Sequence, residues 1–208
     1  TWDAGFYPVV NLGNLVWHDR DNNGQVDSGE AGISNVTVQL FREGDEPTTA
    51  TPVATDTTDG NGNYLFANLA PGRYFVYLPT PPLSYPWSST VTDSSDNGED
   101  NDDNGAQSAN GSNPWGPVMS PVIELATNGE PINDGDDAQG DLTVDFGFFA
   151  PASLGDLVWL DSDKDGVQDQ DETGVSGTAD ERGIPGVLVT LYSSVTNSVV
   201  ATTTTDTH

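Results

Sequence analysis

The chain has 208 residues, of which 33 are acidic and five are basic, and its formal net charge at pH 7 is −28. So few Lys and Arg side chains exclude nucleic acid as a natural partner, because binding of phosphates needs clustered cations. The absence of cysteine excludes disulfides and thiolate metal sites, and no run of about 18 apolar residues could span a bilayer. Abundant Gly, Pro, Thr, Ser, Asn and Asp favour strands joined by turns.

The first predicted strand, LGNLVWH (12–18), leads directly into the acidic segment DRDNNGQVDSGE (19–30). Calcium loops of the EF-hand type carry oxygen ligands at positions 1, 3, 5, 7, 9 and 12, with Gly at position 6 for the turn. Gly24 occupies position 6 here. The predicted ligands are Asp19, Asp21, Asn23, the main-chain carbonyl of Gln25, Asp27 and Glu30. This spacing predicts a calcium site between strands instead of between helices.

Several short runs rich in β-branched and aromatic residues follow, separated by Gly, Pro and Asn. They are VTVQLFR (36–42), YLF (64–66), RYFVYL (73–78), PVIEL (121–125) and LTVDFGFF (142–149). In the first of them, Val36, Val38 and Leu40 share one face. Pro71-Gly72 suits the centre of a type II turn, since Gly accepts a positive φ. Short strands separated by such turn residues predict an all-β chain of tandem, Ig-like antiparallel β-sandwiches.

A long acidic loop is predicted for residues 79–117, where Pro enforces an extended backbone and like charges repel. Its acidic residues are compatible with two interpretations, a weaker calcium site or a solvated loop. They are Asp93, Asp96, Glu99, Asp100, Asp102 and Asp103. The aromatic residues Tyr85, Trp87 and Trp115 in this segment are candidates for stacking on a glycan or for holding the loop against its own domain.

The sequence repeats itself at an offset of 142 positions. LGNLVWHDRDNNGQVDSGEAG (12–32) aligns without a gap on LGDLVWLDSDKDGVQDQDETG (154–174), and WDAGFYP (2–8) aligns on VDFGFFA (144–150). We therefore expect the terminal strand of a preceding repeat at 1–8, a complete repeat at 9–150 and the first part of a second repeat at 151–208.

The second copy predicts a second calcium loop with Gly166 at its turn. Its ligands are Asp161, Asp163, Asp165, the carbonyl of Val167, Asp169 and Glu172. Five of these residues are carboxylates, against four in the first loop, so we expect the second loop to bind calcium more tightly.

Catalytic motifs are missing from the sequence. His18 has Leu160 as its counterpart in the second copy, and no GxSxG, HExxH, P-loop or GxGxxG pattern is present. We therefore expect no enzymatic activity. Asn35 and Asn110 fit the N-glycosylation pattern.

The combination of LGNLVWHDRDNNGQVDSGEAGISNVTVQLF, DGNGNYLFANLAPGRYFVYL and VDFGFF resembles the B-repeats of serine-aspartate-repeat (Sdr-type) bacterial surface proteins. The resemblance implies a calcium-binding β-sandwich related to the CnaB-like fold, acting as a stalk segment of a cell-surface adhesin. It also implies that the loop residues named above carry the principal calcium site. The Lys-Asn crosslink of related domains is not expected, because the sole lysine, Lys164, lies inside a calcium loop.

Three functions remain open from the sequence. The leading hypothesis is an extracellular, non-catalytic stalk or fibre segment that calcium and neighbouring repeats rigidify. The second is a subunit of a head-to-tail filament, assembled from identical chains by donation of the WDAGFY strand. The third is an adhesin module that binds a glycan or a host protein through the long loop.

Overall fold

The computed structural model of the chain describes residues 7–90, 100–108, 114–129, 132, 136, 138–162, 164, 166–168, 181–194 and 196–207. The regular elements of this part of the chain are all strands. It contains no helix long and apolar enough to cross a membrane. The chain divides into two compact units, Thr1–Pro151 and Ala152–His208.

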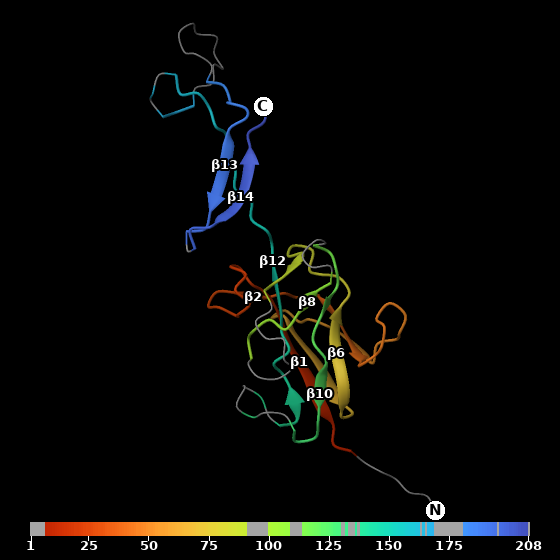
Figure 1. Cartoon of the computed structure of the whole chain (residues 1–208). Helices are drawn as coiled ribbons and strands as arrows, with labels where there is room; N and C mark the ends of the chain where they lie inside the picture. Colours follow the sequence, from red (N-terminus) through yellow and green to blue (C-terminus); the bar gives the residue numbers. More distant parts are fainter. Residues whose placement is uncertain are drawn as a thin grey trace, which may run out of the picture. The chain divides into compact units, whose positions relative to one another are not determined.

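The first unit contains two sheets (Figure 1). One sheet has the order β11-β1-β12-β7, with β2 and β5 also paired to β1. Its strands are β1 (Val10–His18), β2 (Ala31–Gly32), β5 (Asn63–Leu69), β7 (Trp87–Ser88), β11 (Gly140–Asp141) and β12 (Phe146–Phe149). The other sheet has the order β4-β3-β6-β9-β8, with β10 paired to β6. Its strands are β3 (Thr37–Arg42), β4 (Ala54–Thr57), β6 (Gly72–Leu78), β8 (Ala106–Gln107), β9 (Val118–Met119) and β10 (Ile123–Leu125).

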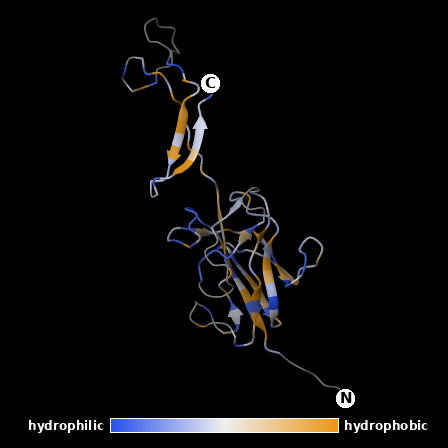
Figure 2. Cartoon of the chain, viewed as in Figure 1, coloured by the Kyte–Doolittle hydropathy of each residue, from blue (hydrophilic) through white to orange (hydrophobic). Residues whose placement is uncertain are grey.

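A single apolar core joins the two sheets, which confirms the predicted β-sandwich. Val16 from β1, Leu40 from β3 and Phe146 from β12 are completely buried in it. Apolar residues are concentrated on the strands, whereas polar residues dominate the connecting segments (Figure 2). The alternation that predicted β3 is confirmed at Val38 and Leu40. Burial of this face supplies the main driving force for folding.

The central strand β1 brings the two ends of the first unit together. It pairs antiparallel with β5 but parallel with β12, where Val16 lies opposite Phe146 and His18 opposite Phe148. The predicted strand 142–149 is shorter in the structure, since β12 starts at Phe146 and Asp145 forms an isolated bridge to Asp103. The end of β1, where the acidic loop begins, therefore lies beside the last strand of the unit.

The turn between β5 and β6 differs from the expected type II turn. Gly72 is the first residue of β6 and has no positive φ, whereas Asn68 adopts a φ of 59°. The prediction of a left-handed Gly72 is therefore wrong. Asn takes up this conformation more readily than most residues because its short polar side chain tolerates it.

The second unit contains the antiparallel hairpin β13 (Leu188–Tyr192) and β14 (Val199–Thr204). Val189 and Leu191, which align with the fully buried Val38 and Leu40 of the first unit, are 40% and 41% exposed. An open pocket of about 910 Å³ lies against them and is also lined by Leu157. The described residues of this unit therefore leave an apolar face exposed.

Candidate calcium site

The acidic loop 19–30 connects β1 to β2, so strands flank it on both sides, as the sequence predicted. Asn22 and Gly24 adopt positive φ values of 57° and 77°, which fold the start of the loop into a tight turn. Gly24 occupies the position where a calcium loop requires Gly, and its left-handed conformation is the physical reason for that requirement.

Asp19 organises the first half of the loop and is completely buried. Its Oδ1 atom accepts hydrogen bonds from the main-chain N–H groups of Asn22 (2.6 Å) and Asn23 (3.3 Å). Its Oδ2 atom accepts one from the N–H of Gly24 (2.8 Å). The N–H of Asp19 donates to the carbonyl of Phe148 (3.0 Å), which attaches the loop to β12.

Glu30 closes the loop from its other end. Its carboxylate accepts hydrogen bonds from the N–H groups of Arg20 (2.6 Å) and Asp27 (3.1 Å). The indole Nε1 of the buried Trp17 donates a third (3.1 Å). The carboxylate is thereby held over the beginning of the loop.

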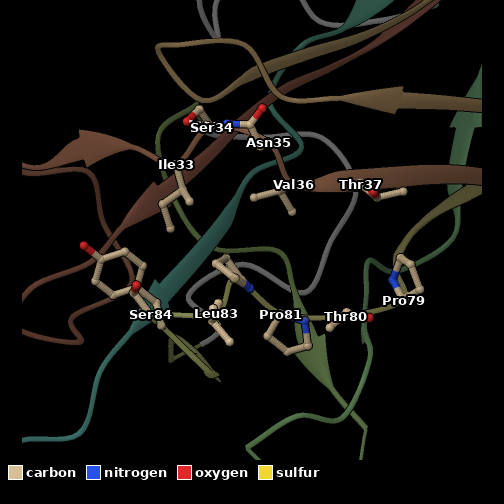
Figure 3. A pocket seen from close by; sticks show the side chains of 12 residues that line it. Ile33, Ser34, Asn35, Val36, Thr37, Pro79, Thr80, Pro81, Leu83 and Ser84 are labelled. Carbon is tan, nitrogen blue, oxygen red and sulfur yellow. Dashed lines mark hydrogen bonds between the residues drawn. The ribbon is translucent and has the colours of Figure 1, made fainter.

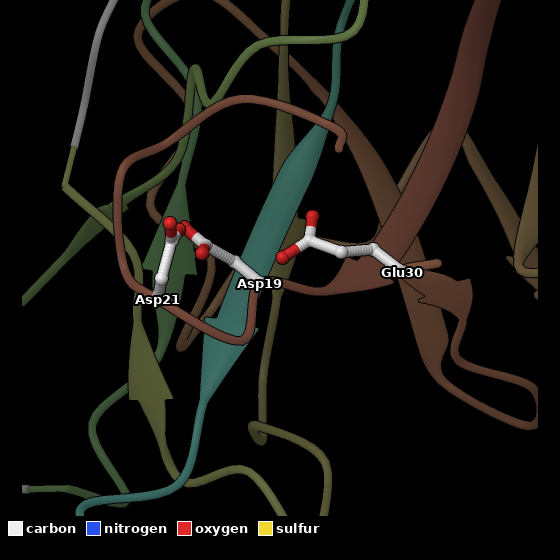
Figure 4. A group of neighbouring side chains, drawn as sticks. All are labelled: Asp19, Asp21 and Glu30. Atoms are coloured by element: carbon white, nitrogen blue, oxygen red, sulfur yellow. The ribbon is translucent and has the colours of Figure 1, made fainter. Parts of the chain in front are cut away.

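Three of the six predicted ligands meet in one cluster. Carboxylate oxygens of Asp19, Asp21 and Glu30 lie within 4.8 Å of one another (Figure 4). The Nδ2 of Asn23 donates to Asp27 Oδ2 (2.9 Å), and Asn23 Oδ1 accepts from the N–H of Gln25 (2.7 Å). The carboxylate oxygens of Asp19, Asp21 and Glu30 are hard ligands, which calcium binds at flexible distances. These residues therefore fit calcium.

A segment from the middle of the chain borders the loop and was not expected there. We call residues 100–105 the strap. The N–H of Val26 donates to the carbonyl of Asn101 (2.9 Å), and the N–H of Asp103 donates to the carbonyl of Gly24 (2.9 Å). Gln25 and Asp102 thereby form an isolated antiparallel bridge.

The sequence left two interpretations of this acidic segment, a weaker calcium site and a solvated loop, and the second does not hold for Asp102 and Asp103 of the strap. Asp102 is 4% exposed and Asp103 is completely buried. Asp103 Oδ1 accepts hydrogen bonds from Gly147 N (3.0 Å) and Gly105 N (3.1 Å), so the strap packs against β12. No signal in the run EDNDDNG distinguishes these two buried acids from their neighbours, because their burial depends on pairing with distant residues.

Burial raises the pKa of Asp103 to about 8. The hydrogen bonds from Gly147 and Gly105 oppose this rise, and the nearby charges of Asp19 and Asp102 contribute to it. Burial also raises the pKa of Asp145 well above its usual range, although main-chain hydrogen bonds partly oppose this. Carboxylates gathered in a poorly hydrated region make the environment of the loop favourable for a cation.

The second predicted loop begins with the same turn as the first. Asp161 Oδ1 accepts from the N–H of Lys164 (2.5 Å), and its Oδ2 accepts from the N–H of Gly166 (3.1 Å). Lys164 and Gly166 have φ values of 68° and 79°. Val167 follows this turn and is exposed. The other four predicted ligands lie outside the described residues: Asp163, Asp165, Asp169 and Glu172.

A second pocket of about 480 Å³ lies between residues 33–37 and 79–85 (Figure 3). Tyr85 lines it and stacks on His18, with ring centroids 4.0 Å apart. Trp87 is half-buried in β7, and Trp115 is 46% exposed. Tyr85 therefore holds the Pro-rich segment 79–85 against the end of β1. This is the role of holding the loop against its own domain, one of the two roles expected for Tyr85 from the sequence.

Comparison with known proteins gives a consistent result for both units. The family model described as SdrD B-like domain matches residues 10–114 and 152–208. The chain is 39% identical over 209 residues to serine-aspartate repeat-containing protein D of Staphylococcus aureus (strain MW2), a match that covers 99% of this chain and 12% of that protein. It is 36% identical over 209 residues to serine-aspartate repeat-containing protein F of Staphylococcus epidermidis (strain ATCC 12228 / FDA PCI 1200), covering 99% of this chain and 10% of that protein.

The chain thus spans only 12% and 10% of the lengths of these two relatives. The family model nevertheless covers most of the chain, including residues of both units. Together with the two-sheet architecture of the first unit, this match shows that the chain belongs to the SdrD B-like domain family.

Proposed function

We propose that the chain is a non-catalytic, calcium-stiffened structural segment of an extracellular cell-surface protein. The observation that carries the proposal is the cluster of Asp19, Asp21 and Glu30 oxygens in a loop with the spacing of a calcium site. Calcium would be held by the predicted loop residues, and its charge would offset the repulsion between their carboxylates. The relatives support the structural role because they are named as repeat-containing proteins.

The position of the loop supports a role in stiffening. Through its bond to Phe148, Asp19 attaches the loop to β12, the last strand of the first unit. The second unit begins at Ala152, directly after that strand. A cation that orders the loop would therefore also restrain the segment through which the first unit continues into the second.

Thermal unfolding with calcium and with a chelator tests this proposal. A ligand that binds only the folded state stabilises it by about 2.7 kcal/mol at one hundred times its dissociation constant. We expect the unfolding midpoint to rise with calcium concentration. X-ray scattering should show a longer and better defined particle in calcium. Unchanged unfolding and unchanged dimensions after chelation would overturn the proposal.

Two matched variants distinguish the loss of a loop carboxylate from the loss of a carboxylate elsewhere on the surface. Glu30→Gln removes a charge and an oxygen ligand from the cluster, so it should weaken calcium binding strongly. Glu124→Gln makes the same chemical change in β10, where Glu124 forms an exposed ion pair with Arg73 (3.1 Å). This control should retain the affinity for calcium, since exposed ion pairs contribute little to stability.

A second candidate function is head-to-tail assembly of identical chains. Residues 2–8 align with 144–150, the region in which Phe146 and Phe148 contribute to the first core. Donation of such a strand is an established mode of protein association. Sedimentation velocity of the chain with and without residues 1–8 tests this candidate: assembly requires a concentration-dependent mass that the deletion abolishes.

A further inference from the structure

Asp145 occupies a central position between β1 and the strap. The residue is completely buried and directly precedes β12. Its Oδ1 accepts a hydrogen bond from the N–H of Leu15 in β1 (3.0 Å). Its Oδ2 accepts one from the N–H of Asn101 in the strap (2.9 Å). One carboxylate therefore connects the central strand to the strap.

The main chain of Asp145 makes a second connection further along the strap. Its N–H donates to Asn104 Oδ1 (2.7 Å), and its carbonyl accepts from the N–H of Asn104 (3.0 Å). Asn104 is also buried. Asp145 thus holds the strap at Asn101, which itself contacts the calcium loop, and at Asn104, on either side of Asp102 and Asp103.

The strap in turn holds the part of the loop that contains the seventh ligand position. Its two hydrogen bonds reach the carbonyl of Gly24 and the N–H of Val26, the neighbours of Gln25. Gln25 and Asp102 consequently form a non-hydrogen-bonded pair, in which the N–H and C=O of Gln25 lie on the edge away from the strap. The N–H of Gln25 donates to Asn23 Oδ1 inside the loop (2.7 Å). In an extended residue the carbonyl points to the same edge as the N–H, so the Gln25 carbonyl faces the loop as well.

We propose that Asp145 is a positioning residue of the calcium loop, which acts through the strap to orient the carbonyl of Gln25 toward the ion. This inference rests on the calcium binding proposed above. Asp145 acts without contacting the ion, in the way that outer hydrogen-bond partners orient metal ligands. Loss of such partners typically weakens metal affinity about 10- to 100-fold.

Isothermal titration of the whole chain with calcium tests the inference through the variant Asp145→Asn. The amide keeps the size of the side chain but presents an NH₂ group where one of the two N–H donors needs an acceptor. We expect the dissociation constant of the first loop to rise about tenfold. Circular dichroism in chelator establishes that the variant is folded before titration.

Ser120→Ala serves as the buried control. Ser120 Oγ accepts a hydrogen bond from Val76 N (2.9 Å) and donates to the carbonyl of Pro121 (2.8 Å), contacts that belong to the other sheet. This variant should lower the unfolding midpoint and leave the dissociation constant for calcium unchanged. If it weakens calcium binding as much as Asp145→Asn does, general destabilisation explains both effects and the positioning role is overturned.

The remaining outcomes separate this inference from the proposal on which it rests. A wild-type chain that binds no calcium overturns the proposed function itself. A wild-type chain that binds calcium, with equal affinity in Asp145→Asn, overturns the positioning role alone. If Asp145→Asn does not fold, Asn104→Ala removes a hydrogen bond between the same two segments, and the same comparison with Ser120→Ala applies.

Discussion

The indole Nε1 of Trp17 donates a hydrogen bond to Glu30 Oε2 (3.1 Å), so a completely buried core residue holds the last ligand of the acidic loop. This contact connects the packing of the sandwich to the geometry of the loop. It also places the fluorescent side chain of Trp17 next to the predicted ion, which gives calcium binding a direct optical signal.

Replacement of Trp17 by Phe should weaken calcium binding, because Phe retains an aromatic ring but has no N–H to orient Glu30. Loss of an outer hydrogen bond of this kind predicts a roughly tenfold higher dissociation constant. Titration calorimetry measures the change. Trp87→Phe is the matched control, since Trp87 lies in β7 and forms a pair with Phe149. Equal calcium affinity in wild type and Trp17→Phe would show that the hydrogen bond does not orient the ligand.

The stability of the calcium-free chain should fall as the pH rises from about 4 to 8. The pKa of Asp103 is about 8 in the folded chain, against an ordinary value of 3.8, so between these values the folded state retains a proton that the unfolded state has released. Deprotonation then favours unfolding, by at most about 1.4 kcal/mol per pH unit for this group. The pKa of Asp145 is also raised in the folded chain, so this residue contributes to the pH dependence with the same sign.

Unfolding in urea at several pH values, with chelator present, measures this effect. Asp103→Asn should flatten the dependence, whereas Asp45→Asn should not, because Asp45 lies in the turn between β3 and β4 and accepts a local hydrogen bond from Arg42 N (3.0 Å). Asp59 does not contribute to the change in stability between about pH 4 and pH 8. Hydrogen bonds from Asn63 and Asn61 lower its pKa, so its contribution is lost only as the pH falls below its ordinary value of 3.8. A steeper slope in Asp103→Asn would contradict the assignment.

Gly32→Ala should be strongly destabilising, because the main chain after the acidic loop passes very close to the turn before β5. A Cβ atom at Gly32 would lie 1.6 Å from the carbonyl oxygen of Asn61. Such overpacking against the backbone costs about 1–3 kcal/mol in free energy of unfolding, or more where the backbone cannot move. Gly60→Ala is the control, since a Cβ there meets nothing within 4 Å. Equal denaturant midpoints for the two variants would contradict this prediction.

We expect two classes of calcium site in the chain, and the second loop should bind calcium more tightly than the first. Its five carboxylates against four in the first loop favour a stronger electrostatic attraction for the ion. Glu30→Gln and Glu172→Gln each remove the last ligand of one loop, so calorimetry of the two variants assigns each affinity to its loop. A higher affinity remaining in Glu172→Gln than in Glu30→Gln would reverse the expected order.

The sequence predicted the strands and turns that depend on residues close together in the chain. The alternation of Val36, Val38 and Leu40 predicted β3, since apolar residues two positions apart face the same side of a strand. The turn that begins each acidic loop was predictable for the same reason. In both copies an Asp accepts the N–H groups three and five positions later, so the whole interaction lies within six consecutive residues.

The surroundings of the first loop were not predictable, because they depend on pairing between distant segments. Asp102 of the strap pairs with Gln25, which lies 77 positions earlier in the chain, and Asp145, which holds the strap, comes later still. In the sequence, Asp102 and Asp103 look the same as the acidic residues around them. Only the pairing of the strap with Gln25 and with the segment before β12 removes them from water and raises the pKa of Asp103.

The sequence by itself therefore determined the all-β class, the repeat and the ligand spacing of the loops, since each is written in residues at short and regular intervals. The tertiary structure alone decided which acids are buried, which carboxylate connects β1 to the strap and how Trp17 meets Glu30. The physical reason is that burial and hydrogen bonding between distant segments arise only when the sheets close around a common core.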